Sequence, residues 1–156
     1  MAKEQLERVL AMQEMMFGPE HVKLAATRTN LGIAYGVLGD HAKKKELLER
    51  VLATQQNAYG SRHTQVASTL TSLGAAHSEL GNHEKAKELL ERALGIKKEA
   101  YGLVHTELAD TLENLGTANS ALHNNAEAKE LLERALEIYK AAGWDTDGLR
   151  RKLEVM

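Results

Sequence analysis

Seven histidines are the residues of this sequence best suited to chemistry, because imidazole binds metal ions and exchanges protons near neutral pH. His21, His63 and His105 recur at intervals of 42 residues. Copies in separate helical layers would lie roughly 10 Å apart, too far to share an ion with bonds of about 2 Å. We therefore expect these three side chains to cap helices or to pack in turns, and we expect no metal site.

The other histidines have similar structural interpretations. His41 and His83 also lie 42 residues apart, so we expect them to cap or pack as well. His77 lies 42 residues after the aromatic Tyr35, and we expect it to be a half-buried core residue. We predict that none of them acts as a metal ligand or a catalytic base.

The carboxylates do not form a recognisable catalytic pair. Glu46 and Arg50 are four residues apart, an order that stabilises an exposed helix, and the same pairing recurs along the chain. The absence of cysteine excludes disulfides, thiolate catalysis and cysteine-based zinc sites. No metalloprotease, nucleophile-elbow or phosphate-loop motif occurs. We therefore expect no enzymatic activity and no cofactor.

Composition narrows the class of protein further. The chain has 156 residues and a formal net charge of -2, without the clustered Lys and Arg of a nucleic-acid-binding surface. No apolar run is long enough for a membrane span, and residues 1–10 lack the apolar core of a secretory signal. These features predict an intracellular, cytoplasmic protein whose partner is neither nucleic acid nor membrane.

An internal repeat of 42 residues organises the whole sequence. Residues 39–80 align with residues 81–122 without a gap, and more than half of the aligned positions are identical. Residues 4–38 follow the same pattern, and residues 128–136 match residues 86–94. A repeat of this length predicts one supersecondary unit per copy, with a core completed by stacking.

Each copy contains two helical segments separated by glycine-containing turns. Leucines at spacings of three, four and seven form one apolar stripe in the first segment, interrupted at Arg28. Gly32, Gly74 and Gly116 lie inside this first helix, where glycine costs about 1 kcal/mol relative to Ala. A close approach by the partner helix would explain them. We expect helices at about 3–16, 21–38, 42–58, 63–80, 84–100, 105–122, 126–142 and 146–155.

These helices predict a single domain over residues 1–156. Its parts are a half repeat at 1–18, three repeats at 21–60, 63–102 and 105–142, and a C-terminal cap helix at 144–156. Trp144, Leu149 and Leu153 are expected to cover the last hairpin, with Arg150, Arg151 and Lys152 facing outward.

The repeat resembles the tetratricopeptide repeat. The resemblance rests on Leu31-Gly32 followed by Tyr35, on Gly81-Asn82, and on the matching positions of the other copies. The 42-residue period and residues 91–105 are similar to the subtype of kinesin light chains and nephrocystin-type arrays. The family implies an all-α fold: an α-solenoid (a right-handed superhelix) of about seven helices plus a short capping helix.

Members of this family are generally scaffolds that bind extended peptides along a concave groove lined by the first helix of each hairpin. By position, the resemblance assigns the groove here to Thr29, Asn30, Ile33, Thr71, Ser72, Ala75, Glu113, Asn114 and Thr117. None of these residues is basic, so we expect no clamp for a terminal carboxylate and poor binding of acidic peptides.

A second interpretation is a self-associating structural repeat without a defined peptide ligand, from a natural amplified array or an engineered one. The N-terminal helix would leave Leu6, Val9, Leu10 and Met16 without a partner helix. Exposed repeat ends of this kind favour homo-oligomers, and near-identical hairpins favour exchange of a hairpin between copies.

Overall fold

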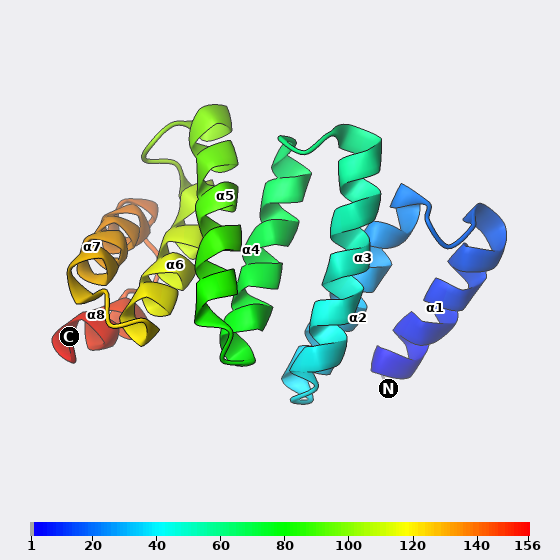
Figure 1. Cartoon of the computed structure of the whole chain (residues 1–156), viewed down its shortest axis with the longest axis horizontal. Helices are drawn as coiled ribbons and strands as arrows, with labels where there is room; N and C mark the ends of the chain where they lie inside the picture. The colour runs from blue at the N-terminus through cyan, green and yellow to red at the C-terminus, as the bar shows by residue number, and fades with distance from the viewer. Residues whose placement is uncertain (1) are drawn as a thin grey trace.

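A computed structural model describes residues 2–156 as a row of antiparallel helices (Figure 1). The α-helices are α1 (Ala2–Phe17), α2 (Ala25–Val37), α3 (His41–Tyr59), α4 (Thr64–Glu79), α5 (His83–Tyr101), α6 (Ala109–Ala121), α7 (Asn125–Ala142) and α8 (Asp147–Glu154). Short 3-10 helices at Val22–Leu24 and Thr106–Leu108 precede α2 and α6. No helix within residues 2–156 is long and apolar enough to cross a membrane.

The predicted all-α solenoid is confirmed. Every expected helix is present, and its ends agree with the predicted ends to within one residue when the 3-10 turns are counted with α2 and α6. Successive helices pack as the hairpins α2–α3, α4–α5 and α6–α7, and α1 and α8 lie at the two ends of the row (Figure 1).

The turns within the hairpins show why glycine recurs there. Gly39 and Gly81 have φ angles of 83° and 79°, in the left-handed region where a side chain is disfavoured. The third hairpin has His123 at the equivalent position, and its φ is 62°. The turn geometry therefore persists where the glycine has been replaced.

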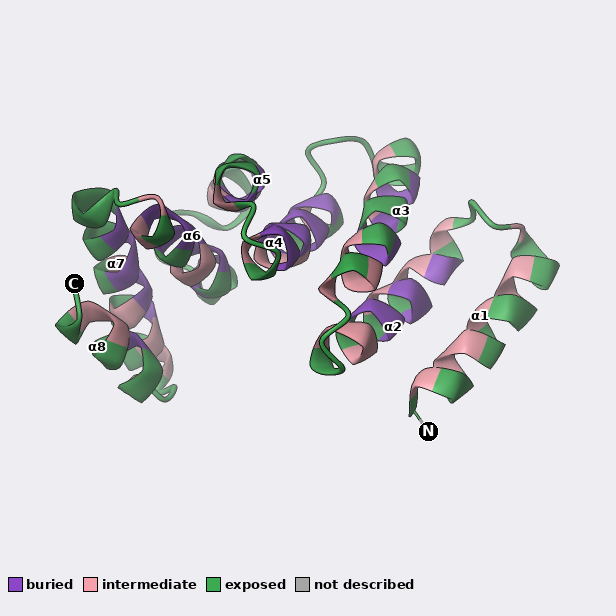
Figure 2. Ribbon diagram, turned by 60° about the horizontal axis from the view of Figure 1, so that its bottom comes forward, coloured by how far each residue is buried: buried purple, intermediate pink, exposed green. Residues whose placement is uncertain are grey.

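The core lies between the two helices of each hairpin and continues into the next hairpin. Buried residues follow the inward faces of α2 to α7, whereas no residue of α1 is fully buried (Figure 2). One apolar cluster extends from α5 to α8 and includes Leu90, Leu112 and Leu132. Burial of this stripe supplies the main stabilisation, since isolated helices of this length are marginal in water.

Arg28 interrupts the apolar stripe of α2 yet is only 1% exposed. Its guanidinium group donates to Glu14 Oε1 at 3.0 Å and to the carbonyl oxygen of Pro19. One terminal nitrogen makes both of these bonds, whereas the buried Nε has no hydrogen-bond partner within residues 2–156. Arg28 thus links α1 and the following turn to α2.

Close packing explains two of the three glycines that recur at one position of the first helices, Gly32, Gly74 and Gly116. A Cβ on Gly74 would lie 2.6 Å from Leu90 Cγ, and a Cβ on Gly116 would lie 2.7 Å from Leu132 Cγ. At Gly32 the nearest atom would be 3.6 Å away, an ordinary contact. The prediction of a close helix approach therefore holds for the second and third hairpins but not for the first.

Candidate functional site

The three repeated histidines cap the first helices, as the spacing predicts. His63 Nδ1 accepts a hydrogen bond from the backbone N–H of Gln65 at 3.1 Å, and its ring stacks on Tyr59 with centroids 4.7 Å apart. His21 and His105 accept the same kind of hydrogen bond; the ring of His105 stacks on Tyr101, whereas that of His21 is tilted against Phe17. Each imidazole therefore has a structural task at a helix start.

His77 is a core residue, also as predicted. It lies in α4 with 8% of its surface exposed, and burial lowers its pKa from the ordinary value. Lys45 lowers the pKa further, whereas Glu49 raises it. The equivalent residue of α6 is Asn119, which is fully buried and donates to the carbonyl oxygen of Leu115. This position accepts polar side chains in the interior of the solenoid.

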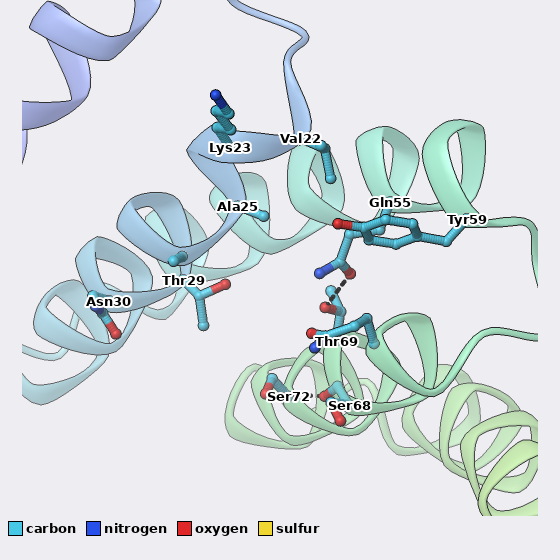
Figure 3. Close-up of a pocket in the computed structure, with 12 residues that line it drawn as sticks. Val22, Lys23, Ala25, Thr29, Asn30, Gln55, Tyr59, Ser68, Thr69 and Ser72 are labelled. Atoms are coloured by element: carbon cyan, nitrogen blue, oxygen red, sulfur yellow. Dashed lines mark hydrogen bonds between the residues drawn. The ribbon is translucent and has the colours of Figure 1, made fainter. Parts of the chain in front are cut away.

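All nine predicted groove residues lie on α2, α4 and α6, the first helices of the three hairpins. We call the space between α2 and α4 the first interval, and the space between α4 and α6 the second interval. The first interval contains a pocket of about 450 Å³ (Figure 3). Of the nine predicted residues, Thr29, Asn30 and Ser72 line it. The other lining residues are Val22, Lys23, Ala25, Ala26, Gln55, Tyr59, Gln65, Ser68 and Thr69.

The base of the first interval is a buried polar pair. Thr69 donates its hydroxyl proton to Gln55 Oε1 at 2.6 Å, and the two side chains are 6% exposed or less (Figure 3). Above this pair, the side chains of Thr29, Asn30 and Gln65 make no hydrogen bond within the described part of the chain. The pocket therefore offers unpaired amide and hydroxyl groups to whatever enters it.

The second interval is closed by its own side chains. Thr71 is 3% exposed, and its hydroxyl oxygen lies 2.8 Å from that of Thr111 on α6. Lys97 of α5, which is 2% exposed, donates to Thr111 Oγ1 at 2.9 Å and to Asp110 Oδ1 at 3.1 Å. Asn114 donates to the carbonyl oxygen of Asp110 at 2.9 Å. Thr71 is thus part of the wall rather than of an open surface.

Beyond α6, the predicted groove residue Glu113 already has partners from within the chain. Its carboxylate accepts from Tyr139 OH at 2.8 Å and from Lys152 Nζ at 2.7 Å. Burial and the Glu113 carboxylate raise the pKa of Tyr139. Lys152 also donates to Thr117 Oγ1 at 3.3 Å. The prediction that Lys152 faces outward is therefore wrong, because the ammonium group turns to the carboxylate on α6.

The predicted C-terminal cap is correct for its leucines and wrong for its tryptophan. Leu149 is 2% exposed and Leu153 packs against the core, so α8 covers α7 as expected. Trp144 stays 48% exposed and meets Tyr139 edge-on, with centroids 5.3 Å apart. It covers little of the last hairpin.

The sequence did not predict the pocket residues that lie at the ends of the first helices or on a second helix. Tyr59 belongs to the end of a second helix, and Lys23 and Gln65 each follow a capping histidine by two residues. The repeat register contains the signal that could have found Lys23 and Gln65, since these two residues occupy equivalent positions. Lys23 adds a cation to the pocket lining, and Lys152 places another beside Glu113 and Thr117; neither lysine is among the nine predicted groove residues.

Comparison with known proteins gives a consistent result. Models of the tetratricopeptide repeat match residues 37–99 and residues 108–142. The solved structure of BtubC (BKLC) from P. vanneervenii superposes with a TM-score of 0.78 at 25% identity, covering 90% of this chain and 56% of that one.

A Podosopora anserina structure described as a kinesin light chain with nearly identical TPR-like repeats has a TM-score of 0.71 at 31% identity, covering 89% of this chain and 66% of that one. The Sgt2 TPR domain from Aspergillus fumigatus, with a TM-score of 0.65 at 23% identity, shares the fold and covers 84% of this chain and 75% of that one. No curated protein matches the sequence. The chain thus spans about half to two thirds of the first two of these structures.

Proposed function

The chain belongs to the tetratricopeptide repeat family and is of the kinesin-light-chain-like type, and from this premise we propose that it binds an extended peptide segment in the first interval of its concave groove. Tetratricopeptide repeats form a protein-interaction scaffold that is generally not enzymatic. The finer assignment to one interval rests on the geometry of that interval.

The observation that carries the proposal is the contrast in hydrogen bonding along the groove. In the first interval Asn30 and Gln65 have amide groups without partners in residues 2–156, beside the open pocket. An amide both donates and accepts, so it can pair with the N–H and C=O groups of an extended backbone. In the second interval the hydroxyl groups of Thr71 and Thr111 are bonded to each other, and Glu113 on α6 is bonded to Lys152. A ligand there would have to break existing hydrogen bonds.

The lining favours a segment with uncharged polar side chains. Lys23 is the only charged residue among the twelve that line the pocket, and its ammonium group lies 4.6 Å from the centroid of the Phe17 ring. A single lysine on the surface cannot form the two-pronged contact by which arginine holds a carboxylate. Tyr59 supplies an aromatic face at one end of the pocket (Figure 3). Segments rich in Ser, Thr, Asn and Gln fit this chemistry.

The proposal is tested by selecting peptides from a random phage-displayed library and measuring their affinity by fluorescence anisotropy. The variant Asn30→Ala should weaken binding of the selected peptides by about tenfold, the equivalent of about one lost hydrogen bond. The matched control is Asn114→Ala, which alters the same repeat position where the amide is already bonded to Asp110. Equal losses in both variants, or no selected peptide at all, would contradict the proposal.

A second candidate function is self-association, because α1 has an exposed apolar face. Val9, Met12 and Met16 are 43%, 63% and 71% exposed. The residues equivalent to Val9 are Val51, Ala93 and Ala135, and each is fully buried inside a hairpin. The first helix of a hairpin from a second copy of the chain could cover this face of α1, either by docking on it or by exchange of a hairpin between copies. Molar mass from light scattering over a hundredfold concentration range tests this: a mass that rises above one chain in the wild type but not in Met12→Glu supports it, and a constant mass excludes it.

A further inference from the structure

The two intervals of the groove contain the same pair of threonines in two different states. Thr29 and Thr69 face the first interval, and their equivalents Thr71 and Thr111 face the second. The second pair is joined across the groove at 2.8 Å, whereas the first pair is not bonded. Accordingly, the contact between α4 and α6 is more extensive than that between α2 and α4. The same chain thus contains one open interval and one closed interval at equivalent positions of the repeat.

The direction of the hydrogen bonds explains the closed version. Lys97 carries an ammonium group, which can only donate, so Thr111 Oγ1 must accept from it at 2.9 Å. Thr71 donates its own proton to the carbonyl oxygen of Ala67 at 3.0 Å, so the 2.8 Å bond between the two threonines uses the Thr111 proton, for which Asp110 Oδ1 at 3.3 Å is the competing acceptor. The chain of donors runs in one direction from α5 through α6 to α4. It draws the two first helices together.

The open version begins from a different residue at the equivalent position. Gln55 replaces lysine there, and its amide oxygen accepts the hydroxyl proton of Thr69 at 2.6 Å. A hydroxyl has one proton, so Thr69 has none left to donate to Thr29. Ser68 stands where α6 has Asp110 and donates to the carbonyl oxygen of Thr64, so no carboxylate is present to pair with a lysine. The base of the first interval therefore has no hydroxyl proton free to donate toward α2.

We propose that the side chain at the base of each interval decides whether that interval can accept a ligand, with Gln55 keeping the first interval open and Lys97 together with Thr111 closing the second. Gln55 is then a specificity-determining residue that acts through Thr69. The effect on peptide binding rests on the proposed function. The effect on the width of each interval does not depend on any ligand.

Exchanging the two bases tests the inference. The variant Gln55→Lys/Ser68→Asp transfers the closed base to the first interval, and Lys97→Gln/Asp110→Ser transfers the open base to the second. Because the chain has no cysteine, spin labels can be placed at cysteines introduced for Glu20, Arg62 and Val104, exposed loop positions spaced 42 residues apart. Pulsed electron paramagnetic resonance then reports the distance across each interval.

The first exchange should shorten the distance between positions 20 and 62, and the second should lengthen the distance between positions 62 and 104. Asp110→Ser alone is the control, because Lys97 still donates to Thr111 and the second interval should stay closed. Circular dichroism checks whether each variant is folded. If a double variant does not fold, the single variant Gln55→Lys or Lys97→Gln takes its place. Unchanged distances in folded variants would overturn the inference.

A selected peptide adds the binding arm of the experiment. Closing the first interval should weaken its binding by about tenfold or more, and opening the second should add a second equivalent of bound peptide. If the distances shift as expected but no peptide binds any variant, the proposed function fails and the control of interval width stands. If binding is lost without a change in distance, the inference itself is wrong.

Discussion

The side chain of Lys44 lies directly on Gly36, so that a Cβ at Gly36 would come within 2.8 Å of Lys44 Cδ. The lysine stem occupies the space that a side chain at position 36 would need, and its ammonium group bonds to both oxygens of Glu79, at 3.0 and 2.8 Å. Lysine replaces the small residue of the other repeats, and glycine accompanies it. The equivalent pairs are Ser78 with Ala86 and Ser120 with Ala128.

This relationship predicts that substitutions at the two positions are coupled. Gly36→Ser should destabilise the wild type because it displaces the Lys44 side chain, and should be tolerated in Lys44→Ala. A double-mutant cycle from urea unfolding should give a coupling free energy of about 0.5–1 kcal/mol in favour of the double variant. Additive effects would show that the two side chains do not compete for the same space.

The three equivalent glycines of the first helices, Gly32, Gly74 and Gly116, should respond differently to the same change. Gly74→Ala and Gly116→Ala place a methyl group against Leu90 and Leu132, and should each lower the free energy of unfolding by about 1–3 kcal/mol. Gly32→Ala meets only ordinary contacts and should be neutral or stabilising by up to about 1 kcal/mol. Thermal unfolding monitored by circular dichroism checks the order. A destabilised Gly32→Ala protein would contradict the packing described for α2.

The capping role of the repeated histidines can be measured at His63. His63→Ala removes both the acceptor for the Gln65 N–H and the stacking on Tyr59, so unfolding should become easier by about 1–2 kcal/mol. Asn is a good helix cap without an aromatic ring. His63→Asn should therefore recover most of the stability that the lost capping hydrogen bond had contributed. An alanine variant as stable as the wild type would mean that the imidazole is an exposed residue without a role in the helix start.

His77 should make stability depend on pH in a defined direction. Because burial lowers its pKa in the folded chain, the unfolded chain binds the proton at higher pH, near 6.5. The free energy of unfolding should therefore fall as the pH decreases below about 6.5, until the lowered folded pKa is passed. Above that window the full stability is present.

The variant His77→Asn is the control for this pH effect. It reproduces the residue of the third repeat, where Asn119 pairs with Asn124, and Asn82 is available as the equivalent partner. Urea unfolding of the two proteins at several pH values isolates the contribution of His77 to the pH dependence, because every other residue is the same in both. Parallel curves for the two proteins would contradict the described burial.

The fold was predictable because the same sequence pattern occurs in several copies of the repeat. The leucine stripes, the turn glycines and the repeated histidines each indicate the same helix boundaries, and the structure has them. Gly32 was the misleading member of its set, since the sequence cannot show that Leu90 and Leu132 reach their glycines while α3 stays further from α2.

The candidate site was predictable only in part. Family position indicates which helix faces the groove, but it does not show that Thr71 is bonded to Thr111 or that Glu113 is held by Lys152. These contacts depend on how closely neighbouring hairpins stack, which follows from side chains on three helices together. Equivalent positions therefore differ in availability although their residue types are similar.

The central claim is that the first interval of the groove is where a peptide binds. Its most direct test is a titration of the ¹⁵N-labelled protein with a library-selected peptide, followed by backbone amide chemical shifts. We expect saturable shifts centred on Asn30, Gln65 and Ser72, with residues of α6 and α7 little affected. Shifts centred on α1, or on the second helices of the hairpins, would contradict it.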